Sequence, residues 1–268
     1  MFIGIIINKS AKLKLARRSF KKWKGFKYNI MPLNKKFKKS KNFLSQIPHW
    51  EKSYKKSDKA MLGYEKKDWL DAKANFSKHD LKILNEPVME NWETPYMRDL
   101  ADIAAAKGGV ILEIGYGMGI SARFIQWHKI KKHIIIEANR QVANEARKFA
   151  KKAKYKTKVI TGLWEDVIDK IPDQSLDGIL FDSYPLSEKE LYQNHFFFFH
   201  AAYKKLRPGG IFTYYSDEIK KFGRVHLKKL QEAGFKKGNI KSTVSKVKPP
   251  KNCLYWKADT ILAPIIIK

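Results

Sequence analysis

Three closely spaced glycines and a glutamate further along the chain have types and spacing that could bind a nucleotide. Gly115, Gly117 and Gly119 directly follow the apolar run 110–114, and a helical pattern begins almost at once. Glycines at such a turn let the backbone approach a ligand closely, and the helix that follows offers free N–H groups. Glu137 ends the next apolar run, where a carboxylate can accept hydrogen bonds from both hydroxyls of a ribose. The alternative is structural: a tight strand-to-helix turn and a glutamate that caps a helix.

The glycine spacing and two later residues favour one class of nucleotide over another. Ile120 stands where the dinucleotide-binding fingerprint requires its third glycine, which weakens the case for NAD. Trp164 and Glu165 follow the third apolar run, where an indole can stack on adenine and a carboxylate can accept a hydrogen bond from its exocyclic amine. Core packing explains a single Trp equally well. With Glu113 ahead of the loop and the later turn LRPGG at 206–210, this pattern resembles class I S-adenosylmethionine-dependent methyltransferases.

Four further segments narrow the resemblance to one family. They are WETPYM at 92–97, GLWED at 162–166, FDSYPLSE at 181–188 and PPKNCLY at 249–255. Their order is that of guanidinoacetate N-methyltransferases, and the resemblance extends over roughly residues 79–268. This combination is far more specific than a glycine loop alone. It implies a methyltransferase whose cofactor is S-adenosyl-L-methionine.

The resemblance also implies roles for individual residues. The glutamate of WETPYM and the aspartate of the DSYP segment, Glu93 and Asp182, would hold the guanidinium of the acceptor together with Tyr184. Taken alone, Glu93 is equally explained as an acid in the first turn of a helix, and Asp182 as a turn residue at the end of a strand. Residues that match the family's contacts to S-adenosyl-L-methionine are Trp69, Met89, Met97, Gly115, Tyr116, Gly117, Met118, Gly119, Ile120, Ser121, Glu137, Ala138, Trp164 and Glu165.

A pair of carboxylates suits the chemistry of a guanidino group. A guanidinium is delocalised and stays protonated at neutral pH, so it is a poor nucleophile. Two carboxylates can hold its planar array of donors, fix one nitrogen in line with a sulfonium methyl group, and accept the proton that is released as the bond forms. This chemistry needs no metal, and the seven histidines show no ligand spacing beside carboxylates. We therefore expect no metal site.

One departure from the family leaves the acceptor open. After its fifth strand the family carries an LTSWG-like loop whose backbone amides hold the carboxylate of guanidinoacetate, whereas this chain has TYYSDEIK at 213–220. Asp217 and Glu218 would repel a carboxylate, and Lys220 or Lys221 could attract one. We predict that the acceptor is guanidinoacetate or a related small guanidino compound. The alternatives are an N-methyltransferase of free or protein arginine, and an RNA-binding or RNA-modifying methyltransferase that uses basic N-terminal residues to contact phosphates.

Alternating apolar runs and amphipathic stretches must position these residues. Such alternation is typical of βαβ units on a parallel sheet, whose ligand site lies at the carboxyl ends of the strands. The sequence predicts an α/β, Rossmann-like methyltransferase fold: a doubly wound, mostly parallel seven-stranded sheet with an antiparallel C-terminal strand. The expected strands are 110–114, 133–137, 158–161, 176–182, 210–215, 240–247 and 260–267, and the expected helices are 121–128, 141–154, 188–206 and 224–233.

Charge sets the first residues apart from the rest of the chain. The 268 residues include 55 Lys and Arg against 26 Asp and Glu, a formal net charge of +29, but residues 1–50 carry fourteen of the bases and no acid. We expect residues 1–60 to be a disordered basic arm, 61–108 to be a helical cap that contributes to the active site, and 109–268 to be the domain that binds S-adenosylmethionine. Nucleic acid is expected as a partner only through the arm.

Apolar runs and cysteine usage set the expected compartment. No apolar run is long enough to cross a bilayer, which predicts that nothing spans a membrane. Cys253 is the single cysteine, so an internal disulfide is impossible and a reducing compartment, the cytoplasm, is expected. The sequence does not indicate which oligomeric state the protein adopts.

Overall fold

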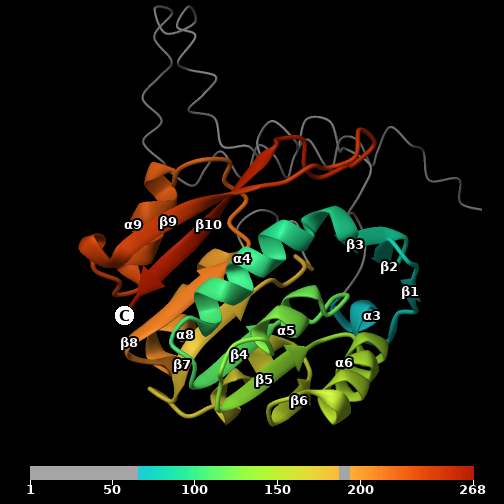
Figure 1. Cartoon of the computed structure of the whole chain (residues 1–268), viewed down its shortest axis with the longest axis horizontal. Helices are drawn as coiled ribbons and strands as arrows, with labels where there is room; N and C mark the ends of the chain where they lie inside the picture. Colours follow the sequence, from blue (N-terminus) through green and yellow to red (C-terminus); the bar gives the residue numbers. More distant parts are fainter. Residues whose placement is uncertain (1–65, 187–193) are drawn as a thin grey trace, which may run out of the picture. The chain divides into compact units, whose positions relative to one another are not determined.

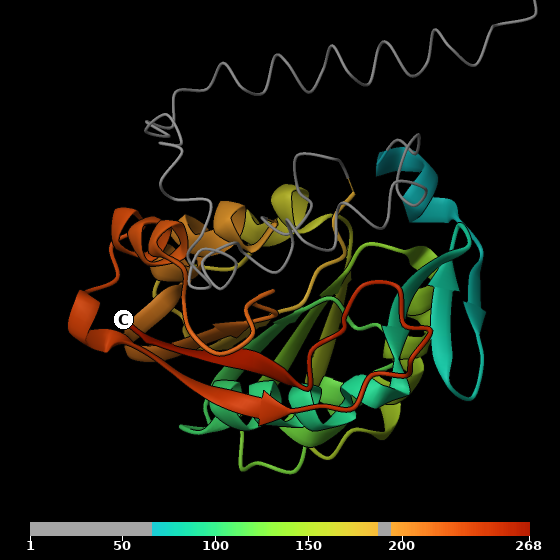
Figure 2. The ribbon, with the colours of Figure 1, turned by 90° about the horizontal axis from the view of Figure 1, so that it is seen from above.

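The computed structural model describes residues 66–186 and 194–268. The basic arm predicted for residues 1–60 lies outside the described residues, as do 61–65 at the start of the predicted cap and 187–193 at the start of a predicted helix. The described residues form a seven-stranded sheet with helices on both faces and a separate three-stranded sheet (Figures 1 and 2). No helix among them is long and apolar enough to cross a membrane.

The large sheet has the strand order β6-β5-β4-β7-β8-β10-β9. Neighbouring strands from β6 to β8 are parallel, and β10 runs antiparallel to both β8 and β9, as predicted for the C-terminal strand. Parallel strands are buried on both faces, which is why several of them are continuous apolar runs in the sequence. The strands are β4 Val110–Ile114, β5 Lys132–Glu137, β6 Thr157–Thr161, β7 Leu176–Phe181, β8 Leu206–Tyr214, β9 Ile240–Lys246 and β10 Thr260–Ile267.

Successive residues of the central strands point to opposite faces of the sheet, and each face has its own helices. Leu112 and Ile179 share a core cluster with Phe198 on one face, while Ile111 and Leu180 belong to the cluster on the other. All five are fully buried, and each contributes about 1.5–3 kcal/mol through removal from water. The helices of the first face are α7 Trp164–Val167, α8 Asn194–Lys205 and α9 Arg224–Glu232, and those of the second are α4 Thr94–Ala105, α5 Ile120–Ile125 and α6 Arg140–Lys152 (Figure 1).

The predicted cap is only partly helical, so the expectation of a helical cap over 61–108 is wrong for residues 74–90. Two adjacent residues, Leu84 and Asn85, join strands β2 and β3 with positive φ angles of 53° and 64°. Leu is unusual in a hairpin turn of this kind, so no turn pattern marks it in the sequence. The elements of the cap are α3 Lys66–Asp71, β1 Ala74–Phe76, β2 Asp80–Ile83, β3 Glu86–Glu90, the short 3-10 helix η2 Asn91–Glu93, and α4.

The start of α6 also anchors α3. Asn139 is the N-cap of α6, and its side-chain oxygen accepts hydrogen bonds from the N–H groups of Gln141 and Val142 at 3.0 and 3.1 Å. Its side-chain amide donates to the carbonyl oxygens of Trp69 and Ala72 at 2.8 and 2.9 Å. One buried residue therefore begins α6 and fixes Trp69 near the carboxyl end of β5.

Strand β8 begins earlier than predicted. The turn predicted at 206–210 is the first half of this strand. Leu206 pairs with Leu176 of β7, after which the register shifts, and Gly209 adopts a φ of 76°. The N–H of Gly209 donates to the carbonyl of Lys268 at 2.8 Å, so the last residue of the chain holds this irregular segment in the sheet. A bulge of this kind lets a proline-glycine-glycine sequence remain in a strand.

Candidate active site

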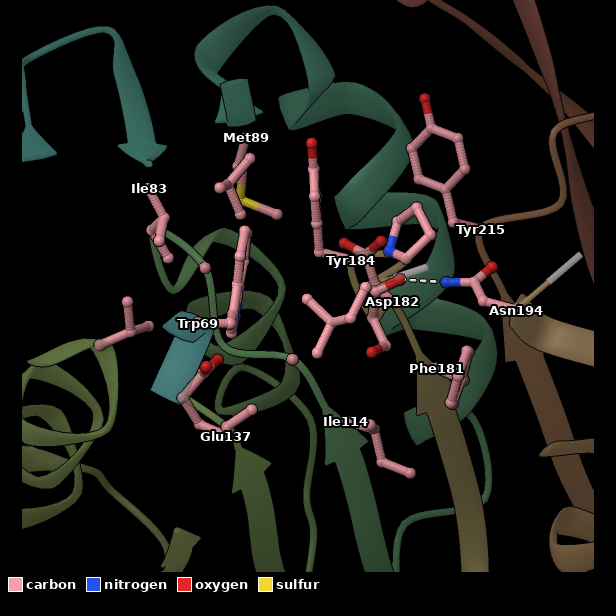
Figure 3. A pocket seen from close by; sticks show the side chains of 18 of the residues that line it. Trp69, Ile83, Met89, Ile114, Glu137, Phe181, Asp182, Tyr184, Asn194 and Tyr215 are labelled. Atoms are coloured by element: carbon pink, nitrogen blue, oxygen red, sulfur yellow. Dashed lines mark hydrogen bonds between the residues drawn. The ribbon is translucent and has the colours of Figure 1, made fainter. Parts of the chain in front are cut away.

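A cavity of about 520 Å³ lies at the carboxyl ends of the parallel strands. Its wall is formed by residues that follow β4, β5, β6, β7 and β8, by residues of the cap, and by the loop between β9 and β10. Figure 3 shows Trp69 and Glu137 at one side of the cavity, and Asp182, Asn194 and Tyr215 at the other. This is where a doubly wound sheet is expected to bind its ligands.

Most of the predicted site residues line this cavity. They are Trp69, Met89, Glu93, Gly115, Gly117, Glu137, Ala138, Trp164, Glu165, Asp182 and Tyr184. Met97 and Ile120 are buried in the core cluster beside α4 and α5 instead, and Ser121 Oγ donates a hydrogen bond to the buried Glu113. The predicted cofactor contacts that the structure places outside the cavity wall are Met97, Tyr116, Met118, Gly119, Ile120 and Ser121.

Two glycines of the loop have left-handed backbone conformations and close neighbours. Gly115 has a φ of 85°, and a Cβ there would lie 1.9 Å from the carbonyl oxygen of Asp182. Gly117 has a φ of 52°, and a Cβ there would lie 2.9 Å from Sδ of Met89. The N–H of Met118 donates to that sulfur at 3.3 Å. Glycines therefore let the loop lie directly against the end of β7 and against β3.

Glu137 is buried at the end of β5 and is held by the glycine loop. Its Oε2 accepts a hydrogen bond from the N–H of Tyr116 at 2.8 Å, and its Oε1 accepts one from the N–H of Asn139 at 2.9 Å. Burial raises the pKa of this carboxyl group, and the surrounding backbone N–H groups oppose the rise. Glu137 also lines the cavity, at the place where the sequence predicted a contact with a ribose.

Two tryptophans contribute to the cavity wall. Trp69 stacks on Tyr184, with ring centroids 4.6 Å apart and an angle of 11° between the planes, so α3 contacts the segment after β7. Trp164 packs edge-on against Phe181 and Phe198, with centroids 6.0 and 5.1 Å apart. It also lines the cavity. Trp164 therefore packs in the core and also lines the cavity, and its stacking on adenine stays a prediction.

Glu93 is buried where η2 meets α4. It stands at the N-cap of α4, but its side chain makes no cap hydrogen bond to that helix. Its Oε1 accepts hydrogen bonds from the N–H of Glu90 at 2.8 Å and from the hydroxyl of Tyr255 at 2.7 Å. Burial and the negative charge of Asp182 raise the pKa of Glu93 to about 8. Sequence reasoning gave Tyr255 no role, because the contact joins residues 162 positions apart.

Asp182 and Asp217 bring two more carboxyl groups to the cavity wall. Burial, together with the charges of Glu113 and Glu137, raises the pKa of Asp182 to about 7. Burial and the charge of Asp182 raise the pKa of Asp217 to about 8. Asp182 therefore acts electrostatically on both Glu93 and Asp217.

Asp217 and Tyr215 line the cavity although they were not predicted as site residues. They follow β8 in the way that Asp182 follows β7, and this position at the carboxyl end of a parallel strand was the signal available in the sequence. Lys220 and Lys221, which were expected to attract an acceptor carboxylate, are exposed and do not line the cavity.

The charge of the cavity is opposite to that of the chain. Among the described residues that line it there is no Lys, Arg or His. Buried carboxyl groups without a base either hold a proton or bind a cation. The cavity is therefore suited to positively charged ligands. The acidic residues on its wall are Glu86, Glu93, Glu137, Glu165, Asp182 and Asp217.

The two histidines five positions apart in α8 do not form a ligand pair. His195 is buried and stacks on Tyr214 and His226, with centroids 5.1 and 5.0 Å apart, whereas His200 is exposed. Within residues 66–186 and 194–268, no group of three or more His, Cys, Asp or Glu could hold a metal ion.

Two yeast proteins are similar in sequence to part of this chain. "Protein arginine N-methyltransferase 2" of Candida glabrata is 28% identical over 169 residues, which are 60% of this chain and 40% of that protein. The protein of the same name from Saccharomyces cerevisiae is 30% identical over 138 residues, which are 48% of this chain and 32% of that protein. The chain therefore spans less than half the length of either yeast protein.

A solved structure and a family model are similar to a larger part of the chain. The crystal structure of spermidine synthase from Thermotoga maritima matches with a TM-score of 0.52 and 15% identity, covering 73% of this chain and 72% of that one. At this identity the similarity concerns the fold alone, and it agrees with the predicted Rossmann-like architecture. The family model described as guanidinoacetate N-methyltransferase matches residues 62–268. Because this match covers more than half of the sequence, the chain belongs to the guanidinoacetate N-methyltransferase family of S-adenosylmethionine-dependent methyltransferases.

Proposed function

We propose that this protein transfers a methyl group from S-adenosylmethionine to a nitrogen of a small guanidino compound, guanidinoacetate or a relative of it. The observation that carries the proposal is that Glu93 and Asp182, which interact electrostatically, both line a cavity whose described lining residues include no base. A guanidinium is a planar cation with donors along its edges, which two carboxylates can bind together. No described Lys, Arg or His of the lining would compete with the guanidinium for these carboxylates.

The charges of the site account for the proton that the reaction releases. A guanidino group has a pKa above about 12 and enters the cavity as a cation. Its charge favours the ionised forms of Glu93 and Asp182, whose pKa values are raised when no cation is present. S-adenosylmethionine, when bound, supplies a sulfonium methyl group. As the N–C bond forms and the S–C bond breaks, the nitrogen loses a proton, which one of the two carboxylates accepts.

Other residues of the cavity wall bind and orient the acceptor and the cofactor. Tyr255 holds Oε1 of Glu93 and leaves Oε2 for the acceptor. Glu137 is assigned to the ribose of the cofactor, with Trp164 and Glu165 assigned to its adenine. Trp69 is proposed to cover the cofactor, and its stacking on Tyr184 holds it in position.

An acceptor panel tests the proposal. Purified protein with labelled S-adenosylmethionine is offered guanidinoacetate, arginine, 4-aminobutylguanidine and a peptide that contains arginine. Asp182→Asn and Glu93→Gln should each lower kcat/KM about 100-fold or more, because each removes one partner of a buried charge pair. Asp102→Asn is the matched control, since this half-exposed carboxylate bonds His128 away from the cavity. Methylation of no guanidine, or unchanged turnover in Asp182→Asn, would refute the proposal.

Arginine, free or within a protein, is the second candidate acceptor. The names of the yeast relatives favour it. So does Asp217, which follows β8 where the family's carboxylate-binding loop was expected. The same panel separates the candidates, because an arginine methyltransferase would prefer free arginine or the peptide to guanidinoacetate.

The cavity offers little to the phosphates of RNA, since its described lining residues are acidic or uncharged. The predicted nucleic-acid contact lies in residues 1–60, outside the described part of the chain. A salt titration of RNA binding by the protein with and without these residues tests that contact. We further propose a cytoplasmic location, which is supported by the single cysteine, Cys253, being a free thiol.

A further inference from the structure

Asp217 places a third carboxyl group in the cavity, in addition to the pair proposed to hold the guanidinium. Its backbone has a left-handed φ of 55°, and its side chain is 18% exposed. Both neighbours are fixed to β10. Ser216 Oγ donates to the carbonyl of Leu262 at 2.7 Å, and the N–H of Leu262 donates to the carbonyl of Glu218 at 2.7 Å. The carboxyl group is therefore held on the cavity wall by a well-anchored loop.

Among the described residues, no positive charge balances Asp217. Nδ1 of His195 lies 4.0 Å from its Oδ2, but burial and the neighbouring His226 hold the pKa of His195 well below its usual value. The ring of His195 is therefore neutral. Asp182, which acts on Asp217 electrostatically, is itself an acid. A carboxylate in this setting attracts a cation and repels an anion.

Tyr215 offers a second acceptor in the same segment. Its ring meets Tyr96 edge-on at 5.1 Å, and its hydroxyl is buried without a hydrogen-bond partner among the described residues. Such groups are rare in native structures because an unmade hydrogen bond in the interior is costly. An ammonium group has three donors and no acceptor, so it can bond a carboxylate and a phenol oxygen at the same time.

We infer that the acceptor carries a second positively charged group in place of a carboxylate, and that Asp217, with Tyr215, binds that group. The inference rests on the proposed function, in which the guanidinium occupies Glu93 and Asp182. The substrate class is an aminoalkylguanidine, with a guanidino group at one end and a primary ammonium at the other. Guanidinoacetate would instead bring its carboxylate to a wall with no described base to receive it.

Two sets of three guanidines, matched in size within each set, test the inference in the wild-type protein. The short set is 2-aminoethylguanidine, propylguanidine and guanidinoacetate, and the long set is 4-aminobutylguanidine, pentylguanidine and 4-guanidinobutanoate. In at least one set the amine should exceed the carboxylate by at least about tenfold in kcat/KM, with the alkyl compound between them. A carboxylate acceptor that matches or exceeds the amine in both sets would overturn the inference.

The variant Asp217→Asn assigns the preference to this residue. It should lower kcat/KM for the preferred amine by at least about tenfold and leave the alkylguanidine within about twofold. Asp259→Asn, an exposed aspartate in the loop before β10, is the matched control. Equal losses on all three compounds, or a raised KM for S-adenosylmethionine with no change in acceptor preference, would overturn the role of Asp217. If Asp217→Asn does not fold, as judged by thermal melting, Tyr215→Phe takes its place and should lower kcat/KM for the amine alone.

The same experiment separates this inference from the proposed function. Methylation of the alkylguanidines without any preference for the amine would uphold guanidino methylation and reject the second cation. Methylation of no guanidine would reject both.

Discussion

The hydroxyl of Tyr255 donates a hydrogen bond of 2.7 Å to Oε1 of Glu93, and this contact joins the loop before β10 to the start of α4. The same hydroxyl lies 3.3 Å from Oε2 of Glu90, which also accepts a bond from Nε1 of Trp92 at 2.7 Å. The rings of Trp92 and Tyr255 are 5.7 Å apart. A carboxyl group held by two hydrogen bonds has little rotational freedom, so the loop before β10 helps to fix the orientation of Glu93.

Removing the Tyr255 hydroxyl should weaken acceptor use. Tyr255→Phe is expected to lower kcat/KM for the guanidino acceptor about tenfold, because Glu93 loses a buried hydrogen bond. That bond lowers the pKa of Glu93, so its loss should move the rise in activity to higher pH. The pH profile of kcat/KM measures both effects. Tyr203→Phe, on α8 against Phe235 and outside the cavity wall, is the control. Equal effects in the two variants would contradict the role of Tyr255.

Acceptor use should depend on pH in a direction set by the carboxyl groups. Glu93 and Asp182 have pKa values of about 8 and about 7 in the ligand-free protein. Below pH 7 both are mainly protonated, so a guanidinium can bind only after protons leave, and kcat/KM should rise as the pH increases from 7 to 8. This parameter reports the free enzyme. Burial and the charge of Asp182 together raise the pKa of Glu93. Asp182→Asn removes that charge, so the pH at which the activity rises should become lower. A profile that is flat across this range would rule out the pair as acceptor ligands.

A methyl group on Gly115 should destabilise the protein. In Gly115→Ala the new Cβ would meet the carbonyl oxygen of Asp182 at 1.9 Å on a backbone with a φ of 85°. We expect the free energy of unfolding to fall by about 3 kcal/mol or more, measured by chemical denaturation. Gly238→Ala is the control, since a Cβ there meets nothing within 4 Å, and it should change stability by less than about 1 kcal/mol. Similar losses in both variants would argue against the close approach of Gly115 to Asp182.

Two substitutions at Asn139 separate its two tasks. Asn139→Ala removes the cap of α6 and the bonds to the carbonyls of Trp69 and Ala72, and should lower the free energy of unfolding by about 1–3 kcal/mol. Asn139→Asp keeps the cap oxygen, but it replaces the donor with a carboxylate oxygen that faces the two carbonyl oxygens. It should retain much of α6 and still weaken binding of S-adenosylmethionine, since Trp69 is no longer anchored. Calorimetric titration with the cofactor measures this. Unchanged affinity in both variants would remove Trp69 from the proposed cofactor site.

The seven-stranded sheet was the most predictable part of the fold. The strands expected at 110–114 and 260–267 coincide with β4 and β10, because burial on both faces leaves an unmistakable apolar run. The small sheet of the cap was missed for the opposite reason. Its strands are short and partly exposed, and the turn at Leu84 uses a residue that rarely adopts a positive φ.

The candidate site was predictable where a motif marks it. Glu93, Glu137 and Asp182 were predicted and do line one cavity. Tyr255 and Asp217 were not predicted as site residues. The contact of Tyr255 with Glu93 depends on tertiary packing, and no local pattern encodes it. Asp217 lies in a segment that differs from the family's sequence. There the resemblance shows that the family's carboxylate-binding loop is absent, but it assigns no role to the residues that replace it.

The contact between Gly115 and Asp182 also bears on the rate of the proposed reaction. The N–H of Asp182 donates to the carbonyl of Ile114 at 2.9 Å, so the loop proposed for the methyl donor and the carboxylate proposed for the acceptor belong to adjoining, hydrogen-bonded backbones. The distance between this loop and the backbone of Asp182 is therefore set by main-chain packing. It would vary more if only flexible side chains joined them. Reactants held at a fixed spacing behave as if their local concentration were very high, and much of the entropic cost of bringing them together is met when the protein folds.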